Sequence, residues 1–421
     1  MASTGIRKTA LSLAVAGAFA GGVSQAHASA FALIEQSASG LGNSYAGAAA
    51  AAEDASTIFY NPAGMSLLPG GMQVSAGLAL INLSAKFSDS GSVAAGGRTL
   101  GGTGGDAGDL SAVPNVYFAM DVAPNWKVGV GVSVPFGLKT EYDPTWMGRF
   151  QAIKSDISTL NLNPSVSYKL NETVSLGFGV NYQSIDAEFT SAVNLGAGGE
   201  TTADIKAKDS GSLGYNLGAM FQLAPDTRLG VSYRSPIKYH LTGTATFASP
   251  LVTGGNVSID IKMPDTASIA LQHRLNPSWT LLADVTRTGW AKIKELRIDL
   301  DTGGTLSNTP ENFKNTWRVG VGAVHRYDDA WSIKMGLAFD QTPVNDTDRT
   351  ARLPDNNRLW LSVGGQYKLS KDGTLDFGLA HLFIKDASIN QNGGSTAANG
   401  QLLGTYKGSV DILGAQFAYR F

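Results

Sequence analysis

The chain has 421 residues, with 32 basic and 34 acidic side chains, a formal net charge of −2, 51 glycines and no cysteine. This balance supplies no basic surface for nucleic acid, so we expect no nucleic-acid partner. No run of 18 or more apolar residues follows the N-terminus, which argues against a bundle of transmembrane helices.

The first 28 residues have the pattern of a secretory signal peptide. Arg7 and Lys8 precede the apolar run "ALSLAVAGAFAGGV", and "AHA" at residues 26–28 is a small-residue cleavage site. We predict a signal peptide at residues 1–28 and a mature start at "SAFALIEQ". A membrane anchor helix is the alternative, but the run is short and rich in glycine. The protein is therefore predicted to be exported.

Residues 29–71 differ from the rest of the mature chain. They are rich in Ala, Gly and Ser and do not alternate between apolar and polar positions. The stretch "YAGAAAAAED" favours a short helix, because alanine has the highest helix propensity.

Residues 72–421 read as a series of strands. In "WKVGVGVSV", residues 126–134, the Trp and four Val fall on one face and Lys, Gly and Ser on the other. The alternation recurs at 160–170, 174–182, 331–340 and 358–369. We count 14 strands of about ten residues, the length that crosses a bilayer when tilted.

The connections favour an outer-membrane barrel. Six short turns alternate with seven longer polar segments, near 88–110, 140–156, 190–211, 248–256, 301–314, 342–355 and 387–405. An even strand number with this alternation predicts a 14-stranded antiparallel β-barrel with both termini periplasmic. A barrel that wide passes water unless it is filled, so residues 29–71 are predicted to form a hatch, or plug, in its lumen.

A soluble β-sandwich is the alternative fold, because it also alternates apolar and polar residues. The strict alternation of short and long connections argues against it. So does the polar face, which is mostly Gly, Ser, Ala and Asn.

Pro135, Phe136 and Gly137 interrupt the third predicted strand. Proline lacks a backbone N–H, and glycine tolerates unusual dihedral angles, so pairing with a neighbouring strand should fail here. The alternative is that Pro135 only ends the strand near a loop.

Aromatic residues cluster beside the short turns and at the C-terminus. An interfacial girdle is expected there, and its residues would be Trp126, Tyr168, Trp279, Tyr327, Trp331 and Tyr367. The chain ends with Phe417, Tyr419 and Phe421 on one face, which resembles the signal read by the barrel assembly machinery.

No pattern in the sequence predicts catalysis, a cofactor or a metal. An outer-membrane phospholipase needs a nucleophile and a base, but no G-x-S-x-G occurs, and the four mature-chain histidines are scattered. The acidic pairs Asp299/Asp301 and Asp346/Asp348 lack a twelve-residue calcium loop ending in Glu and read as solvated loop residues.

The mature start "SAF…E…SASGLGNSYAG", the later "NPAGM" and the stretch from "YDDAWSIKMG" to "GGQYKL" resemble the FadL family of outer-membrane long-chain fatty-acid transporters, which includes hydrocarbon channels of the TodX type. The resemblance spans the mature chain. It implies a 14-stranded barrel with an N-terminal hatch and an inward kink in the third strand that opens the wall.

The resemblance also assigns roles to single residues. Asn61, Pro62 and Ala63 match the family's NPA stretch, which lies near the kink and helps to gate it. Phe31 matches an aromatic residue of the substrate pocket. From the sequence alone, "NPAG" is a common turn and Phe31 a packing residue.

We therefore expect passive uptake of long-chain fatty acids by a monomeric barrel in contact with outer-membrane lipid and lipopolysaccharide. Uncharged aromatic hydrocarbons are the alternative cargo, and a general polar porin is a further one. Lys314 is the one candidate cation for a carboxylate, since the end of the fifth strand offers only Asp186 and Glu188.

Overall fold

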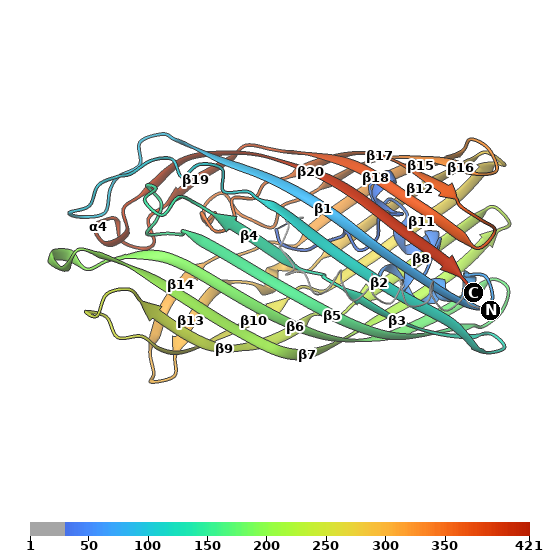
Figure 1. The fold of residues 1–421 in the computed structure, drawn as a ribbon, viewed down its shortest axis with the longest axis horizontal. Helices are drawn as coiled ribbons and strands as arrows, with labels where there is room; N and C mark the ends of the chain where they lie inside the picture. Colours follow the sequence, from blue (N-terminus) through green and yellow to red (C-terminus); the bar gives the residue numbers. More distant parts are fainter. Residues whose placement is uncertain (1–29) are drawn as a thin grey trace, which may run out of the picture.

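The structure, a computed structural model, describes residues 30–421 and is a closed barrel with a chain segment inside it (Figure 1). The predicted signal peptide and Ser29 lie outside the described residues. The sheet closes on itself because β1 (Met72–Asp89) pairs antiparallel with both β2 (Leu110–Ala123) and β20 (Leu402–Arg420). Closure removes the free sheet edges that would otherwise expose unpaired backbone groups.

Within residues 30–421, twenty strand segments make up fourteen antiparallel strands, which confirms the predicted fold class. The other continuous strands are β5 (Lys154–Lys169), β6 (Val174–Asn194), β7 (Glu200–Ala224), β16 (Trp331–Asp340) and β17 (Arg358–Lys368). The interrupted strands are β3/β4 (Trp126–Ser133, Gly137–Glu141), β8/β9 (Thr227–Arg234, Ile237–Phe247), β10/β11 (Gly255–Met263, Thr266–Asn276), β12/β13 (Trp279–Thr288, Glu295–Leu300), β14/β15 (Thr305–Pro310, Thr316–Arg326) and β18/β19 (Gly373–Ile384, Ala387–Gln391).

The outer wall carries a belt of exposed apolar side chains. On β17, Leu359, Leu361 and Val363 are each about half exposed, while Trp360 and Ser362 between them are buried inside. A continuous exposed apolar belt of this kind faces lipid, whereas a soluble sandwich would bury it.

Aromatic pairs lie beside the short turns. Trp126 packs on Tyr168 with ring centroids 4.5 Å apart, and Trp331 packs on Tyr367 at 4.7 Å. The C-terminus lies at this end of the barrel (Figure 1). Trp and Tyr side chains prefer the membrane–water interface, so these pairs mark the edge of the apolar belt at the short-turn end of the barrel.

One predicted loop is mostly strand. The sequence predicts a long polar loop near 190–211, but β6 continues to Asn194 and β7 begins at Glu200. These strand extensions lie beyond the lipid, so their outward face is polar as well as their inward face. Without an apolar face they have the same composition as a loop.

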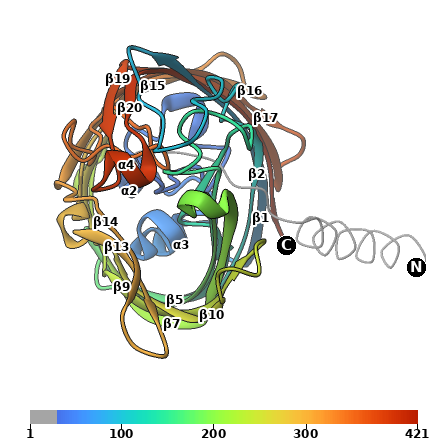
Figure 2. The same ribbon diagram turned by 90° about the vertical axis from the view of Figure 1, so that its left-hand side faces the viewer.

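Residues 30–71, called here the lumenal segment, lie inside the barrel (Figure 2). They contain η1 (Leu41–Asn43), α2 (Ala48–Ala51), α3 (Thr57–Tyr60) and η2 (Pro62–Leu67). The remaining short helices are η3 (Gly196–Gly198), η4 (Trp290–Lys292) and α4 (Thr396–Asn399). No helix among the described residues is long and apolar enough to cross a membrane.

Small residues on the inner wall let the lumenal segment approach the strands closely. A Cβ on Gly230 would lie 1.9 Å from the carbonyl oxygen of Ala49, and one on Gly336 would lie 2.1 Å from the carbonyl carbon of Asn43. Any larger residue at either position would displace the segment, which explains why the inward face is rich in glycine.

Candidate functional site

The third strand is broken at residues 134–136, called here the kink segment. β3 ends with Ser133 opposite Asn161 of β5, and β4 resumes with Gly137 opposite Ser158. Four steps along one strand thus oppose three along the other, so the kink segment contains one extra residue, as in a bulge. Pro135 lies at its centre and has no N–H to donate.

On its other side, β4 lacks a strand partner among the described residues. The β2–β3 ladder ends where Val116 meets Val132, and β4 pairs only with β5. The amide of Glu141 donates to the carbonyl of Ala107, outside the strands, at 3.1 Å. The backbone ladder of the wall is therefore interrupted between the start of β2 and β4.

The lumenal segment pairs with the kink segment instead. Ala32 forms an isolated antiparallel bridge with Phe136. The amide of Leu33 donates to the carbonyl of Pro135, and the amide of Gly137 to the carbonyl of Phe31, both at 2.8 Å. Residues 31–33 thus act as a short extra strand that satisfies the backbone that β2 leaves free.

Two side chains complete this backbone pairing. The Gln36 amide donates to the carbonyl of Val134 at 2.7 Å and accepts from its N–H at 3.1 Å. The Thr159 hydroxyl accepts from the Phe136 N–H at 3.0 Å and donates to its carbonyl at 2.8 Å. The kink segment is therefore held by side chains that could release it without breaking the barrel.

Two cavities lie on either side of residues 31–33. The inner cavity, about 150 Å³, is bordered by residues 32–34, Pro62, Pro135 and Phe136 together with inward residues of β8, β11, β12 and β15. The outer cavity, about 50 Å³, lies nearer the long loops and is mostly apolar; its lining includes Phe31, Leu138, Ile157, Ile185, Phe189 and Phe313.

Phe31 lies between the two cavities. Its ring contacts Trp290 edge-on with centroids 4.8 Å apart and lies 6.2 Å from Phe136. Phe31 borders the outer cavity, and its neighbours Ala32 and Leu33 border the inner one. These three aromatic side chains therefore form a partition between the cavities.

One cation, Arg352, and two acids, Glu295 and Glu311, border the outer cavity beside its apolar wall. Arg352 donates through Nη1 to the Lys154 carbonyl and the Ser155 hydroxyl, both at 3.0 Å, and its Nε and Nη2 have no hydrogen-bond partner within residues 30–421. The side chain of Glu311 also makes no hydrogen bond there, and its Oε2 is buried. Free polar groups in an apolar cavity are suited to a polar ligand group.

Burial controls the charges of Glu311, in the break between β14 and β15, and Arg352, in the connection from β16 to β17, both beyond the apolar belt. Burial raises the pKa of Glu311 to about 8, and burial lowers the pKa of Arg352 to about 10. At neutral pH Arg352 is therefore a charged guanidinium and Glu311 a neutral carboxylic acid.

The predicted NPA stretch lies against the wall. The Asn61 side-chain amide donates to the carbonyls of Ala49 and Ala219 at 2.7 and 3.1 Å, and its oxygen accepts from the Ala63 N–H at 3.1 Å. Pro62 borders the inner cavity together with Pro135. The structure thus brings Pro62 and the kink segment to one cavity, whereas Asn61 and Ala63 pack on β6 and β7.

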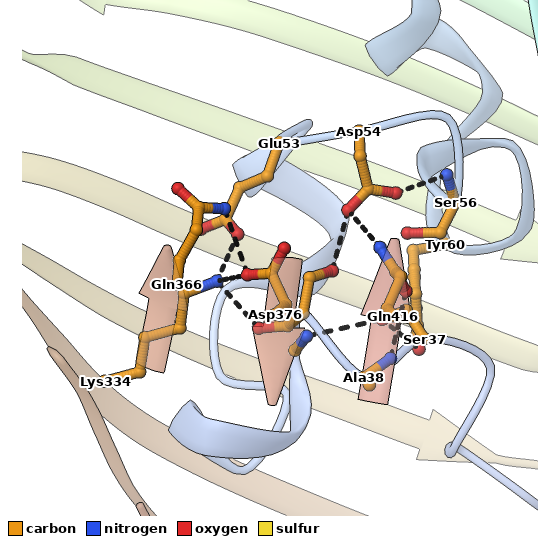
Figure 3. A network of polar contacts seen from close by, with 12 residues as sticks. Ser37, Ala38, Glu53, Asp54, Ser56, Tyr60, Lys334, Gln366, Asp376 and Gln416 are labelled. Atoms are coloured by element: carbon orange, nitrogen blue, oxygen red, sulfur yellow. Dashed lines mark hydrogen bonds and ion pairs between the residues drawn. The ribbon is translucent and has the colours of Figure 1, made fainter. Parts of the chain in front are cut away.

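Buried polar groups fasten the lumenal segment to the wall (Figure 3). Lys334 of β16 lies 3.1 Å from Asp376 of β18 and 2.6 Å from Glu53, and it donates to the carbonyl of Ser39 at 2.9 Å. Gln416 of β20 donates to Asp54 at 2.8 Å. These contacts hold the segment against β16, β18 and β20.

The remaining candidates lie apart from the cavities. At the end of β20, Phe417 stacks on Tyr419 with centroids 6.1 Å apart, and Tyr419 meets Phe421 edge-on at 5.0 Å. Lys314 is exposed and lines neither cavity. No group of three or more metal-ligating side chains is found among residues 30–421.

Sequence reasoning missed Arg352, Glu311, Trp290 and Gln36. Arg352 lies in the polar stretch "DRTARLPDNN", whose one local hint is its apolar neighbours Ala351 and Leu353. Nothing in the sequence indicates that this connection folds inward onto β5 and β6.

Comparison with known proteins agrees with this architecture. The sequence profile of the family described as "Outer membrane protein transport protein (OMPP1/FadL/TodX)" matches residues 19–421. The chain is 28% identical over 439 residues to the "Long-chain fatty acid transport protein" of Escherichia coli K12, covering 94% of this chain and 95% of that protein.

Solved structures share the fold. The crystal structure of a Pseudomonas aeruginosa FadL homologue is similar with a TM-score of 0.86 at 24% identity, covering 93% of this chain and all (100%) of that one. The Pseudomonas putida toluene transporter TodX gives 0.67 at 17% identity, covering 87% and 94%. These relatives are transport proteins rather than enzymes. With a profile match over nearly its whole length and a lipid-facing barrel, the chain belongs to the OMPP1/FadL/TodX family of transport proteins of the Gram-negative outer membrane.

Proposed function

We propose that this protein is a passive uptake channel for long-chain fatty acids. Cargo enters the outer cavity from the extracellular side, passes the partition at Phe31 and leaves sideways through the wall beside β4. The observation that carries this proposal is the free edge of the Arg352 guanidinium in a mostly apolar cavity. The name of the Escherichia coli relative supports the same cargo.

The outer cavity suits an amphipathic anion. Its apolar lining favours an alkyl chain, since each methylene removed from water gains about 0.8 kcal/mol. The two unbonded nitrogens of Arg352 offer the parallel donors that bind a carboxylate. Glu311, neutral at pH 7, adds no competing negative charge.

The cavity sizes require movement. A dry cavity of about 150 Å³ holds a benzene-sized molecule, and the outer cavity of about 50 Å³ is smaller than that. A long chain therefore enters only when Phe31 leaves its place between Trp290 and Phe136. Because Phe31 is next to Ala32, its displacement pulls on the bridge that occupies the kink segment, which makes residues 31–33 the gate.

A lateral exit explains release without an energy source. An apolar site that binds a long chain well would retain it in water, but transfer into lipid keeps the chain away from water. The interrupted strand ladder beside β4 is the place in the wall where cargo would pass, once residues 31–33 move away.

Uncharged aromatic hydrocarbons are the second candidate cargo. The mostly apolar lining of the outer cavity suits them, and they would leave Arg352 with its existing bonds to the β5 backbone. Deleting the gene and measuring growth on oleate and on toluene separates the two. Normal oleate uptake in the deletion strain, with no other such channel present, would rule out the fatty-acid proposal.

Replacing Arg352 with glutamine tests the carboxylate contact. A hydrogen bond to a charged group contributes about 1.5–3 kcal/mol, so we expect oleate to bind roughly 10- to 100-fold more weakly. Binding of oleyl alcohol, which has no charge, should change little. Equilibrium binding to the purified protein in lipid nanodiscs measures both, and Lys314→Gln, an exposed cation, is the matched control. Equal losses for acid and alcohol would contradict the assignment.

Oleate affinity is also expected to fall as pH rises through about 8. A fatty-acid carboxyl titrates near a glutamate and stays ionised over this range. Below pH 8 Glu311 is neutral; above it, its carboxylate competes with the ligand for Arg352, which stays charged up to about pH 10. Asp348 and Glu295 are the other acids facing the site. In Glu311→Gln the fall should disappear in binding curves measured from pH 6.5 to 9; an unchanged profile would exclude Glu311 as the titrating group.

A further inference from the structure

Four charged side chains border the inner cavity, and packing of the lumenal segment does not by itself account for all of them. Arg234, Arg318, Asp284 and Asp340 all border it. Arg318 and Asp284 form a buried ion pair at 3.2 Å, and Asp340 lies in register between Arg318 and Arg358. Each of these three groups therefore has a residue of opposite charge paired with it or directly across from it in the sheet, and Arg234 is the fourth charged residue.

Arg234 has no acidic partner among the described residues. It is the last residue of β8, and its guanidinium donates to the side-chain oxygen of Asn181 and to the carbonyl of Phe59, the latter at 3.0 Å. It also lies 4.4 Å from the centre of the Phe59 ring. All of these contacts are uncharged. A cation inside a protein is destabilising unless a counter-charge is present, so a ligand anion would complete this site.

The position of Arg234 fits a step between entry and exit. The cavity that it borders is also bordered by Pro135 and Phe136, next to the unpaired wall. Trp290 borders this cavity and contacts Phe31 of the outer one. At about 150 Å³ the inner cavity has room for a carboxylate and its first few methylenes, while the rest of the chain still crosses the partition.

We propose that the inner cavity is a second binding site for anionic amphipaths, with the Arg234 guanidinium as its carboxylate contact. The head group moves from Arg352 to Arg234 before the alkyl chain reaches the opening beside β4. This inference rests on the proposed function and adds a second cation to the path. With two cations along the path, the fatty-acid carboxylate stays next to a guanidinium while the alkyl chain passes the partition.

The test compares Arg234→Gln with a matched control on the same strand. Arg228 also donates to carbonyls of the lumenal segment, Ala50 at 3.2 Å and Ala51 at 3.1 Å, but it does not border the cavity. Arg228→Gln therefore removes a similar anchor of the segment and leaves the proposed site intact. Arg234→Lys keeps the charge and should retain the site.

The assay is oleate and oleyl alcohol binding to the full mature chain in lipid nanodiscs, followed by transfer into vesicles. We expect wild type, Arg228→Gln and Arg234→Lys to transfer bound oleate into vesicles at similar rates and Arg234→Gln to transfer it roughly tenfold more slowly. Oleyl alcohol binding and transfer should be unchanged. Oleate transfer at the wild-type rate in Arg234→Gln, or equal losses for oleate and oleyl alcohol, would overturn the second site alone. A wild-type protein that binds no oleate would overturn the proposed function together with it.

A measurement on the wild-type chain covers the case in which Arg234→Gln does not fold. A fatty acid with a photoreactive diazirine next to its carboxyl group should label residues of the inner cavity around Ser232–Arg234 as well as residues around Arg352. Labelling confined to the outer cavity would refute the second site.

Discussion

Oleate uptake should stop when residue 32 is joined covalently to residue 136. In the double variant Ala32→Cys/Phe136→Cys, a disulfide would fix residues 31–33 on the kink segment, so the proposed gate could not leave the wall. The geometry is favourable, because the flanking hydrogen bonds make Ala32 and Phe136 a non-hydrogen-bonded antiparallel pair, whose Cα atoms lie about 4.5 Å apart. We expect at least roughly tenfold slower uptake in cells grown without reductant.

The chain has no cysteine of its own, so no other disulfide can form within it. Reductant should restore uptake in the double variant and should have no effect on either single-cysteine variant, which controls for the loss of the Phe136 ring. Disulfide formation is checked by mass spectrometry. Full uptake with the disulfide intact would show that cargo passes without movement of residues 31–33, and the lateral route would be wrong.

Lys334→Met should loosen the lumenal segment inside an intact barrel. The Lys334 ammonium is buried between Asp376, Glu53 and the Ser39 carbonyl (Figure 3). Removing one partner of a buried ion pair leaves an uncompensated charge and costs about 3–5 kcal/mol. We expect the segment to become sensitive to protease in nanodiscs, and cells to become permeable to large polar antibiotics.

Two variants separate this effect from a general loss of stability. Lys371→Met removes a cation that is 89% exposed and should change nothing. Lys334→Met/Asp376→Leu removes both buried charges and should recover part of the loss, because no unpaired carboxylate remains on β18. If Lys334→Met resists protease as well as wild type does, the ion pair does not hold the segment.

The strands could be predicted from the sequence because successive side chains of a strand point to opposite faces. The faces of β16 and β17 follow from their own residues, whatever lies beside them. The polar extensions of β6 and β7 could not be told from a loop, because outside the lipid a strand needs no apolar face. Where the lipid ends does not follow from those residues alone.

The break at Pro135 can also be predicted from nearby residues, since a proline has no N–H in any fold. The segment that pairs with the kink segment cannot be predicted in this way. Ala32 lies more than a hundred residues away from Phe136 in the chain, and nothing in "SAFALIEQ" indicates that it forms an extra strand. Gln36 joins the kink segment only because the lumenal segment passes beside it.

By itself the sequence determined an exported chain, a barrel of fourteen strands and the strand in which the wall is weak, because composition and period-two alternation act over a few neighbouring residues. Only the tertiary structure decided which backbone occupies that weak place, and that Arg352, Glu311 and Arg234 border cavities inside the wall. Burial and pairing of these charges depend on loops and strands that closure of the barrel brings together, and no short stretch of sequence contains that information.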